Sequence, residues 1–204
     1  MTLDELAIKH GSDKSSKHHG YCEVYEKFFH ELQYRGGLTL LEIGYGGYEY
    51  PDRGGAGARM WSEYFINGQI VSIDIHAKNN TGIERFRFFQ GSQIDDTFLA
   101  NLVGKIGNPD IIVDDGSHNS IKTMTSFYYL FPELKPGGWY VIEDLEASYW
   151  DNEEFQGGLN NPRSTVNSLK DIVDTINHKH SGQADHGIHS IHFYEKIAFI
   201  QKKA

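Results

Sequence analysis

Residues 38–47, LTLLEIGYGG, decide the fold. An apolar run that ends in glycines is typical of a buried parallel strand followed by a tight turn. In a dinucleotide-binding fingerprint the glycines open a helix at once, whereas residues 48–57 (YEYPDRGGAG) add a proline and further glycines that delay the next helix. The stretch therefore predicts an α/β fold in which a glycine turn approaches a ligand other than a pyrophosphate.

The rest of the chain alternates between strand and helix patterns on either side of this stretch. Further apolar runs predict strands at residues 69–75, 85–90, 110–113 and 139–142. Helical spacing of apolar residues predicts helices at residues 58–65, 95–103, 120–131 and 163–177. Residues 188–203 alternate around Tyr194-Glu195-Lys196, which indicates a hairpin. We therefore expect a Rossmann-like, open, mostly parallel seven-stranded sheet with a C-terminal antiparallel hairpin, covered by helices on both faces.

Composition limits the partners and the organisation of the chain. The 204 residues predict a single domain over residues 1–204, with residues 1–36 as an N-terminal helical cap. No apolar run approaches the length of a membrane span, and the first residues carry no basic-then-apolar leader. A net charge of −9 without a long basic cluster argues against a nucleic-acid partner. The single Cys22 favours a reducing compartment, so we expect a cytoplasmic protein.

Acidic residues gather where the predicted strands end. Asp114-Asp115 and Glu143-Asp144 follow two candidate strands, and parallel pairing would place both pairs at one edge of the sheet. Carboxylates so close repel one another unless a cation neutralises them. Oxygen ligands without cysteine favour Mg²⁺ or Mn²⁺, with Ca²⁺ as an alternative and Zn²⁺ less favoured. His118 lies close enough to act as a general base. The alternative is that some of these acids cap helices and that His118 is a surface histidine.

Three other strand ends suggest contacts with an organic ligand. The turn from Glu42 through Gly44 and Tyr45 suits a ligand with a positive amine, although a plain glycine turn is the alternative. Asp74 ends the second strand, where a carboxylate can accept both hydroxyls of a ribose or cap the next segment. Ser92-Gln93 follows the third strand and could face an adenine.

At these residues the sequence resembles the macrolide-sugar O-methyltransferases, of the mycinamicin VI 2''-O-methyltransferase and demethylmacrocin O-methyltransferase type. The shared motifs cover most of the first 150 residues: His10-Gly11-Ser12-Asp13-Lys14, His19-Gly20-Tyr21, Leu41-Glu42-Ile43-Gly44, Arg59-Met60-Trp61, Gly91-Ser92-Gln93, Asp114-Asp115-Gly116-Ser117-His118, Ile142-Glu143-Asp144-Leu145 and Ser148-Tyr149-Trp150. Two differences leave the acceptor open: the family carries an additional N-terminal domain, and it usually has Gly-Asp-Gln where this chain has Gly91-Ser92-Gln93.

The resemblance implies a class I methyltransferase fold, S-adenosylmethionine as methyl donor and Mg²⁺ (or Mn²⁺) as metal. It implies Asp115, Glu143 and Asp144 as metal ligands and His118 as catalytic base. It also assigns a set of residues to the donor: Ser12, Glu42, Gly44, Tyr45, Asp74, Ser92, Gln93 and Asp114. The segment that contains Ser12 would fold over the methionine end of the donor.

The resulting hypothesis is an O-methyltransferase of natural-product biosynthesis that acts on a hydroxyl of a sugar or a glycosylated natural product. The acceptor is then a small molecule or glycan, and a homo-oligomer is compatible with the sequence. Two alternatives are a non-catalytic S-adenosylmethionine-binding protein of a biosynthetic cluster and a metal-dependent hydrolase that uses the same acids.

Overall fold

The computed structural model describes residues 1–79 and 81–204, which form two compact units, residues 1–92 and residues 93–204. The single domain expected over residues 1–204 stays a prediction, and each unit is described by itself. Of the helices in the part of the chain that is described, none is long and apolar enough to cross a membrane.

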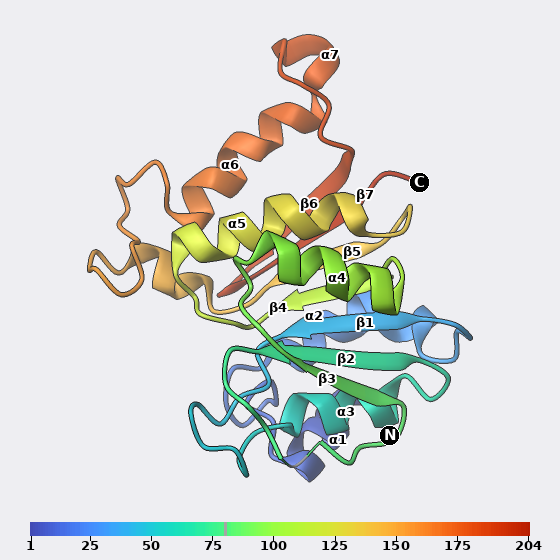
Figure 1. Ribbon diagram of the computed structural model, residues 1–204. Helices are drawn as coiled ribbons and strands as arrows, with labels where there is room; N and C mark the ends of the chain where they lie inside the picture. Colours follow the sequence, from blue (N-terminus) through green and yellow to red (C-terminus); the bar gives the residue numbers. More distant parts are fainter. Residues whose placement is uncertain (80) are drawn as a thin grey trace. The chain divides into compact units, whose positions relative to one another are not determined.

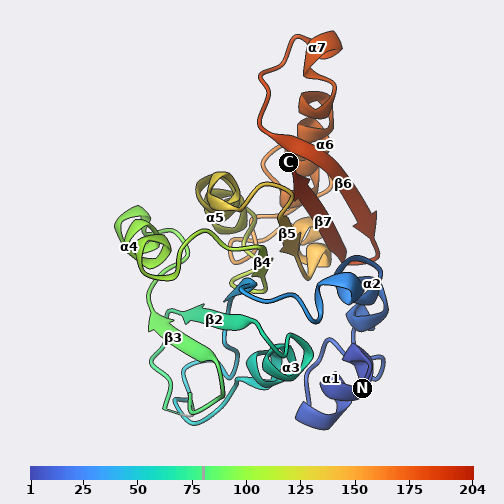
Figure 2. The ribbon, with the colours of Figure 1, turned by 90° about the vertical axis from the view of Figure 1, so that its right-hand side faces the viewer.

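The first unit is a three-stranded parallel sheet covered by helices. Its elements are α1 (Leu3–His10), α2 (Tyr21–Phe29), η1 (His30–Leu32), β1 (Thr39–Ile43), α3 (Ala56–Tyr64), β2 (Gln69–Asp74) and β3 (Phe86–Gln90). The strand order is β3-β2-β1, with Leu41 opposite Val71 and Val71 opposite Arg87. All five residues of β1 are buried, as the apolar run predicted. Figures 1 and 2 show α1 beside α3, and the two helices pack on each other.

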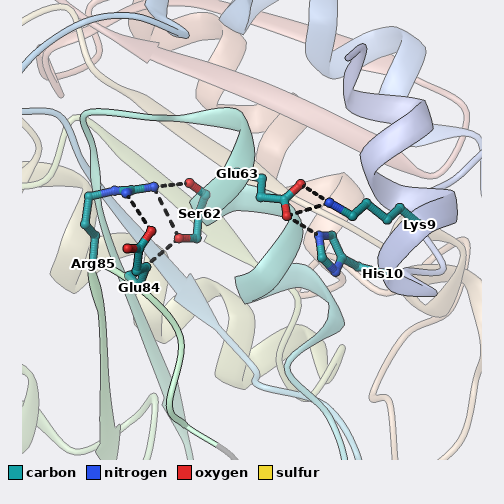
Figure 3. A network of polar contacts seen from close by, with 6 residues as sticks. All are labelled: Lys9, His10, Ser62, Glu63, Glu84 and Arg85. Carbon is teal, nitrogen blue, oxygen red and sulfur yellow. Dashed lines mark hydrogen bonds and ion pairs between the residues drawn. The ribbon is translucent and has the colours of Figure 1, made fainter.

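Polar contacts hold the helices of this unit in place (Figure 3). On α1, Lys9 Nζ lies 2.7 Å and His10 Nε2 3.3 Å from Glu63 Oε1 on α3. On the other side of α3, Ser62 Oγ donates to the carbonyl oxygen of Glu84, 2.6 Å away, just before β3. These contacts fix α3 to α1 on one side and to the segment before β3 on the other. The long turn that follows β1 therefore ends at a helix whose position is fixed.

The second unit contains a mixed sheet and the remaining helices. Its elements are α4 (Asp96–Ile106), β4 (Ile111–Asp114), α5 (Ser120–Leu130), η2 (Phe131–Glu133), β5 (Trp139–Ile142), η3 (Leu145–Tyr149), α6 (Thr165–Ile176), α7 (His178–Ser181), β6 (Ile188–Tyr194) and β7 (Ile197–Lys202). The strand order is β4-β5-β7-β6; β4 and β5 are parallel, and β7 is antiparallel to both of its neighbours. Figure 1 shows α5 between α4 and α6.

The seven strands of the two units confirm the predicted fold class, because the strands up to β5 pair in parallel and the chain ends in an antiparallel hairpin. The hairpin turns at Glu195-Lys196, as expected from the alternation around these residues. The described part of the N-terminal segment contains the helices that the predicted cap requires, α1 and α2.

Candidate functional site

Two parallel strands of the second unit bring acidic residues to one edge. β4 and β5 pair with Asp114 opposite Ile142, so Asp115 and Glu143 lie one residue beyond the paired ends. The amide of Glu143 still donates to the carbonyl oxygen of Asp114 at 3.0 Å, which keeps the two chains side by side beyond the strands. Asp144 then opens η3. The register of the strands therefore explains why acids distant in sequence meet here.

Asp115, His118 and Asp144 form a candidate metal cluster. One ligand atom from each of the three lies within 4.8 Å of the other two, and all three side chains are partly exposed. His118 Nε2 lies 3.6 Å from Asp144 Oδ2. Two carboxylates and an imidazole at this spacing can bind a divalent cation, and oxygen ligands suit Mg²⁺ or Mn²⁺.

Glu143 occupies a different environment from its neighbour Asp144. Its side chain is 3% exposed, and it is not part of the cluster found among the described residues. Because successive residues at the end of a strand point to opposite faces, Glu143 and Asp144 do not reach the same point unless the chain bends. The role of Glu143 as a metal ligand stays a prediction.

His118 and Asp144 both adopt the left-handed backbone region, with φ of 52° at each residue. Such backbone costs a non-glycine residue about 1 kcal/mol or more and persists only where the surroundings impose it. Both side chains belong to the candidate metal cluster. Backbone strain therefore coincides with the residues that the sequence predicted to be functional.

A buried polar network supports the loop that carries His118. Asp114 accepts hydrogen bonds from Ser126 Oγ at 2.7 Å and from the Tyr140 hydroxyl at 3.1 Å. Gln93 Nε2 donates to Ser126 Oγ at 3.2 Å, and Gln93 Oε1 accepts from the Ser117 amide at 3.0 Å. Burial raises the pKa of Asp114 to about 6, although the donors Ser126 and Tyr140 oppose this shift.

The predicted donor-binding residues Gln93 and Asp114 are thus already engaged within the second unit, where they fix the start of the loop from Asp115 to His118. Their contact with a methyl donor stays a prediction. Sequence reasoning missed Ser126 and Tyr140. The apolar spacing within residues 120–131 did not point to Ser126, whose burial follows from the packing of α5.

In the first unit, the glycine turn after β1 is organised around Asp74 at the end of β2. The amide of Tyr45 donates to Asp74 Oδ2 at 3.1 Å, and the amide of His76 donates to Asp74 Oδ1 at 2.9 Å. Gly44 has φ of 97°, a conformation that favours glycine. A carboxylate offers about four acceptor positions, so the partly exposed Asp74 keeps capacity for two ribose hydroxyls.

Glu42, which the sequence suggested as a partner for a positive amine, has protein partners. Its side chain is 3% exposed; Trp61 Nε1 donates to Oε1 at 3.1 Å and Lys14 Nζ lies 3.8 Å from the same oxygen. A charge-paired, buried carboxylate of this kind positions the neighbouring chain segments. A contact between Glu42 and a donor stays a prediction.

The other predicted donor residues of the first unit differ in their exposure. Ser12 is buried, and its hydroxyl accepts from the Lys14 amide at 3.4 Å, which turns Lys14 inward. The ring of Tyr45 is buried against Phe86 and Phe88, with ring centroids 5.6 and 5.4 Å away, and burial raises the pKa of its hydroxyl. Ser92, just after β3, is partly exposed. Tyr45 therefore contributes its backbone amide to the turn, while its side chain packs in the core.

The comparisons with known proteins agree with the resemblance seen in the motifs. No family model matches the chain. The chain is 39% identical to 8-demethyl-8-alpha-L-rhamnosyl tetracenomycin-C 2'-O-methyltransferase of Streptomyces olivaceus, over 99% of the chain and 55% of that protein. It is 35% identical to mycinamicin VI 2''-O-methyltransferase of Micromonospora griseorubida, over 98% of the chain and 52% of that protein.

A solved structure shows the same fold. The chain superimposes on the MycE methyltransferase from the mycinamycin biosynthetic pathway, in complex with Mg, SAH and mycinamycin VI, with a TM-score of 0.91 and 35% identity. The match covers 100% of the chain and 55% of MycE, so the chain spans about half the length of the relatives that it matches. The whole chain is therefore similar to a segment that makes up about half the length of each of these sugar O-methyltransferases.

Proposed function

We propose that this protein transfers the methyl group of S-adenosylmethionine to a hydroxyl of a sugar carried by a glycosylated small molecule, with Mg²⁺ or Mn²⁺ as an essential metal. The observation that carries the proposal is the meeting of Asp115, His118 and Asp144, with ligand atoms within 4.8 Å of one another. The relatives' names support it, since they describe methyl transfer to oxygen on rhamnosyl tetracenomycin and on mycinamicin VI.

The residues present fit both absent groups. For the metal, Asp115 and Asp144 supply oxygen ligands, and Glu143 is the third acid at the same strand ends. For the donor, Asp74 retains acceptor positions for a ribose, beside the glycine turn of Gly44. The proposed donor set is completed by residues several of which position the chain around the donor: Ser12, Glu42, Tyr45, Ser92, Gln93 and Asp114.

The protein side chains then have separate tasks in the reaction. When bound, the metal lowers the pKa of a hydroxyl that it coordinates, and the sulfonium donor supplies an electrophilic methyl group. The carboxylates of Asp115 and Asp144 would bind the metal that coordinates the acceptor hydroxyl. His118 takes the proton from the acceptor hydroxyl as its oxygen attacks the methyl carbon; the carbon–sulfur bond of the donor breaks, and its electron pair stays on the sulfur of S-adenosylhomocysteine. Asp144 Oδ2, 3.6 Å from His118 Nε2, helps to orient the imidazole.

The proposal includes the setting of the enzyme. It acts in the cytoplasm as part of natural-product biosynthesis, on a small acceptor, without a nucleic-acid or membrane partner. The net charge of −9 supports the part that concerns nucleic acids. Self-association is compatible with the proposal and is measured by sedimentation velocity.

The test is methyl transfer by the 204-residue chain to rhamnosylated tetracenomycin C, with and without Mg²⁺. We expect turnover that EDTA abolishes and that Asp115→Asn lowers by about 100-fold or more in kcat/KM. Asp151→Asn, a change of the same type on an exposed residue, is the control and keeps full turnover. Full activity of Asp115→Asn in EDTA would contradict the proposal. Tight S-adenosylhomocysteine binding without any metal-dependent turnover would favour the non-catalytic alternative, and no affinity for it would favour a hydrolase.

A further inference from the structure

An apolar pocket of about 530 Å³ lies within the second unit, beside η3. Three elements form its walls: η3, the start of α6, and the turn between β6 and β7. The lining includes Leu145, Tyr149, Val166, Lys170, Phe193 and Lys196. None of them belongs to the metal cluster of Asp115, His118 and Asp144.

The walls combine exposed aromatic rings with charged side chains. Tyr149 and Phe193 are 50% and 43% exposed, so large apolar surfaces face solvent here. Among the charged lining residues, Lys196 Nζ lies 3.4 Å from Glu146 Oε1, and Lys170 is exposed. A mostly apolar pocket with a small number of polar groups is the usual form of a site for a small organic molecule.

One wall residue of the pocket is the sequence neighbour of a member of the metal cluster. Leu145, one of its wall residues, directly follows Asp144, and its amide donates to the carbonyl oxygen of Lys196 at 2.8 Å. The pairing of β5 with β7 places Ala198 opposite Ile142, so the hairpin turn lies at the end of β5 from which Glu143 and Asp144 extend. The segment that forms one wall of the pocket, η3, therefore begins directly at Asp144 of the metal cluster.

The size of the pocket indicates what occupies it. A volume of about 530 Å³ falls within the range of roughly 300–1,000 Å³ that is typical of sites for small organic ligands. The exposed surface of the walls is mostly apolar and includes aromatic faces, although Glu146, Lys170, Glu195 and Lys196 also line the pocket. Such a surface suits an apolar ring system better than a sugar. The relatives act on sugars attached to a larger non-sugar group, as the name rhamnosyl tetracenomycin-C states.

We propose that this pocket binds the apolar, sugar-free part of the acceptor, the aglycone, while the sugar lies at the cluster of Asp115, His118 and Asp144. The inference rests on the proposed function for the identity of the sugar site. The pocket determines which glycosides are accepted, because it recognises the group that carries the sugar and leaves the reacting hydroxyl to the metal cluster.

The test measures aglycone binding without donor or metal, so that it does not depend on methyl transfer. Tetracenomycin C is titrated by calorimetry into the wild-type chain, Val166→Phe and Val173→Phe. Val166 is a buried wall residue at the start of α6, whereas Val173 lies two turns further along α6, 38% exposed and outside the pocket wall. We expect Val166→Phe to weaken binding about tenfold or more by filling the pocket, and Val173→Phe to bind as the wild type does.

A second variant keeps the test valid if Val166→Phe folds poorly. Phe193→Ala removes an exposed aromatic wall, so its melting temperature stays near the wild-type value while binding of tetracenomycin C weakens several-fold. Where turnover is measurable, both pocket variants lower kcat/KM for rhamnosylated tetracenomycin C more than kcat/KM for methyl α-L-rhamnoside.

The outcomes separate the two proposals. Aglycone binding that depends on Val166 and Phe193, in a chain without methyl transfer to any acceptor, supports the pocket and contradicts the proposed function. Equal binding of tetracenomycin C to the wild type, Val166→Phe and Phe193→Ala overturns the pocket proposal, as does no binding to the wild type. A change in sedimentation coefficient in the pocket variants, without a change in aglycone affinity, also overturns it and assigns the pocket to a second copy of the chain.

Discussion

His118 combines a left-handed backbone, with φ of 52°, with a side chain that lies 3.6 Å from Asp144. The residue at this position must tolerate the strained backbone and also present a basic nitrogen to the site. Asparagine meets the first requirement, because it adopts left-handed backbone more readily than most residues. It does not meet the second, because its side chain has no basic nitrogen. The substitution therefore removes the proposed base while it preserves the backbone.

We therefore expect His118→Asn to fold with an unchanged melting temperature and to lose methyl transfer by about 100-fold or more in kcat, the range of a general base. The control is His189→Asn, on an exposed position of β6, which retains wild-type turnover. Turnover of His118→Asn at half the wild-type rate would show that another group takes the proton.

Tyr140 tests the buried network that supports the same loop. Its hydroxyl donates to Asp114 Oδ2 at 3.1 Å in the core. Tyr140→Phe removes this donor from a buried acceptor, which costs about 1–3 kcal/mol in the free energy of unfolding. Tyr128→Phe, on a residue that is 56% exposed, is the matched control and changes the stability little. The two variants are compared by urea unfolding, and equal stabilities would mean that the network contributes nothing.

At the scale of elements, the period of apolar residues was sufficient to predict each strand within one residue at either end. The predicted strand at residues 38–43 is β1 (Thr39–Ile43), and the hairpin turns where the alternation places it. The helix predicted at residues 95–103 extends to Ile106, because the structure accommodates Gly104 within α4 and ends the helix at Gly107. Helix boundaries depend on capping geometry, which apolar spacing does not encode.

The site was predictable where it depends on strand ends and unpredictable where it depends on packing. The register of the parallel strands brings the segments of Asp115 and of Glu143-Asp144 to one edge, which followed from the sequence. That Asp144, with its left-handed backbone, joins Asp115 in the cluster did not follow from the register. The partners of Glu42 did not follow, since Lys14 and Trp61 reach it only through the packing of the N-terminal segment and α3. Pairwise contacts of this kind require the full three-dimensional arrangement.

The helical glycines of α3 and α4 provide a matched pair of substitutions. A Cβ at Gly57 in α3 would lie 2.6 Å from Glu42 Oε1, a buried oxygen held by Trp61, whereas a Cβ at Gly104 in α4 would meet nothing within 4 Å. We expect Gly57→Ala to lower the free energy of unfolding by about 1–3 kcal/mol through overpacking. Gly104→Ala raises it by up to about 1 kcal/mol, because alanine favours helix. Thermal unfolding of both proteins measures the difference, and stabilisation by Gly57→Ala would contradict the placement of Glu42.

At the scale of the whole molecule, one ion-paired acid gives a pH dependence with a definite sign. The hydrogen bond from Lys9, with a smaller contribution from His10, holds the pKa of Glu63 below its ordinary value. A lowered folded-state pKa stabilises the protein above the unfolded-state pKa, and this stabilisation is lost as the pH falls through the folded value. Since Glu63 is 41% exposed, the effect stays within about 1 kcal/mol.

We therefore expect the melting temperature of the wild type to fall more steeply than that of Glu63→Gln when the pH is lowered from about 5 to about 3. Glu31→Gln, on an exposed residue of η1, follows the wild type. High salt reduces the difference by screening the exposed charges. Parallel curves for Glu63→Gln and the wild type at low salt would show that the contact between α1 and α3 does not depend on this charge.

The central claim is that the acids at the ends of β4 and β5 bind a divalent cation. The most direct measurement is a crystal structure of the protein with Mn²⁺ and S-adenosylhomocysteine, in which anomalous scattering locates the metal. We predict a single strong peak bound by the carboxylates of Asp115 and Asp144, with Glu143 completing the ligand set and His118 beside it. A peak elsewhere, or no peak at saturating Mn²⁺ while these carboxylates keep only protein partners, would contradict it.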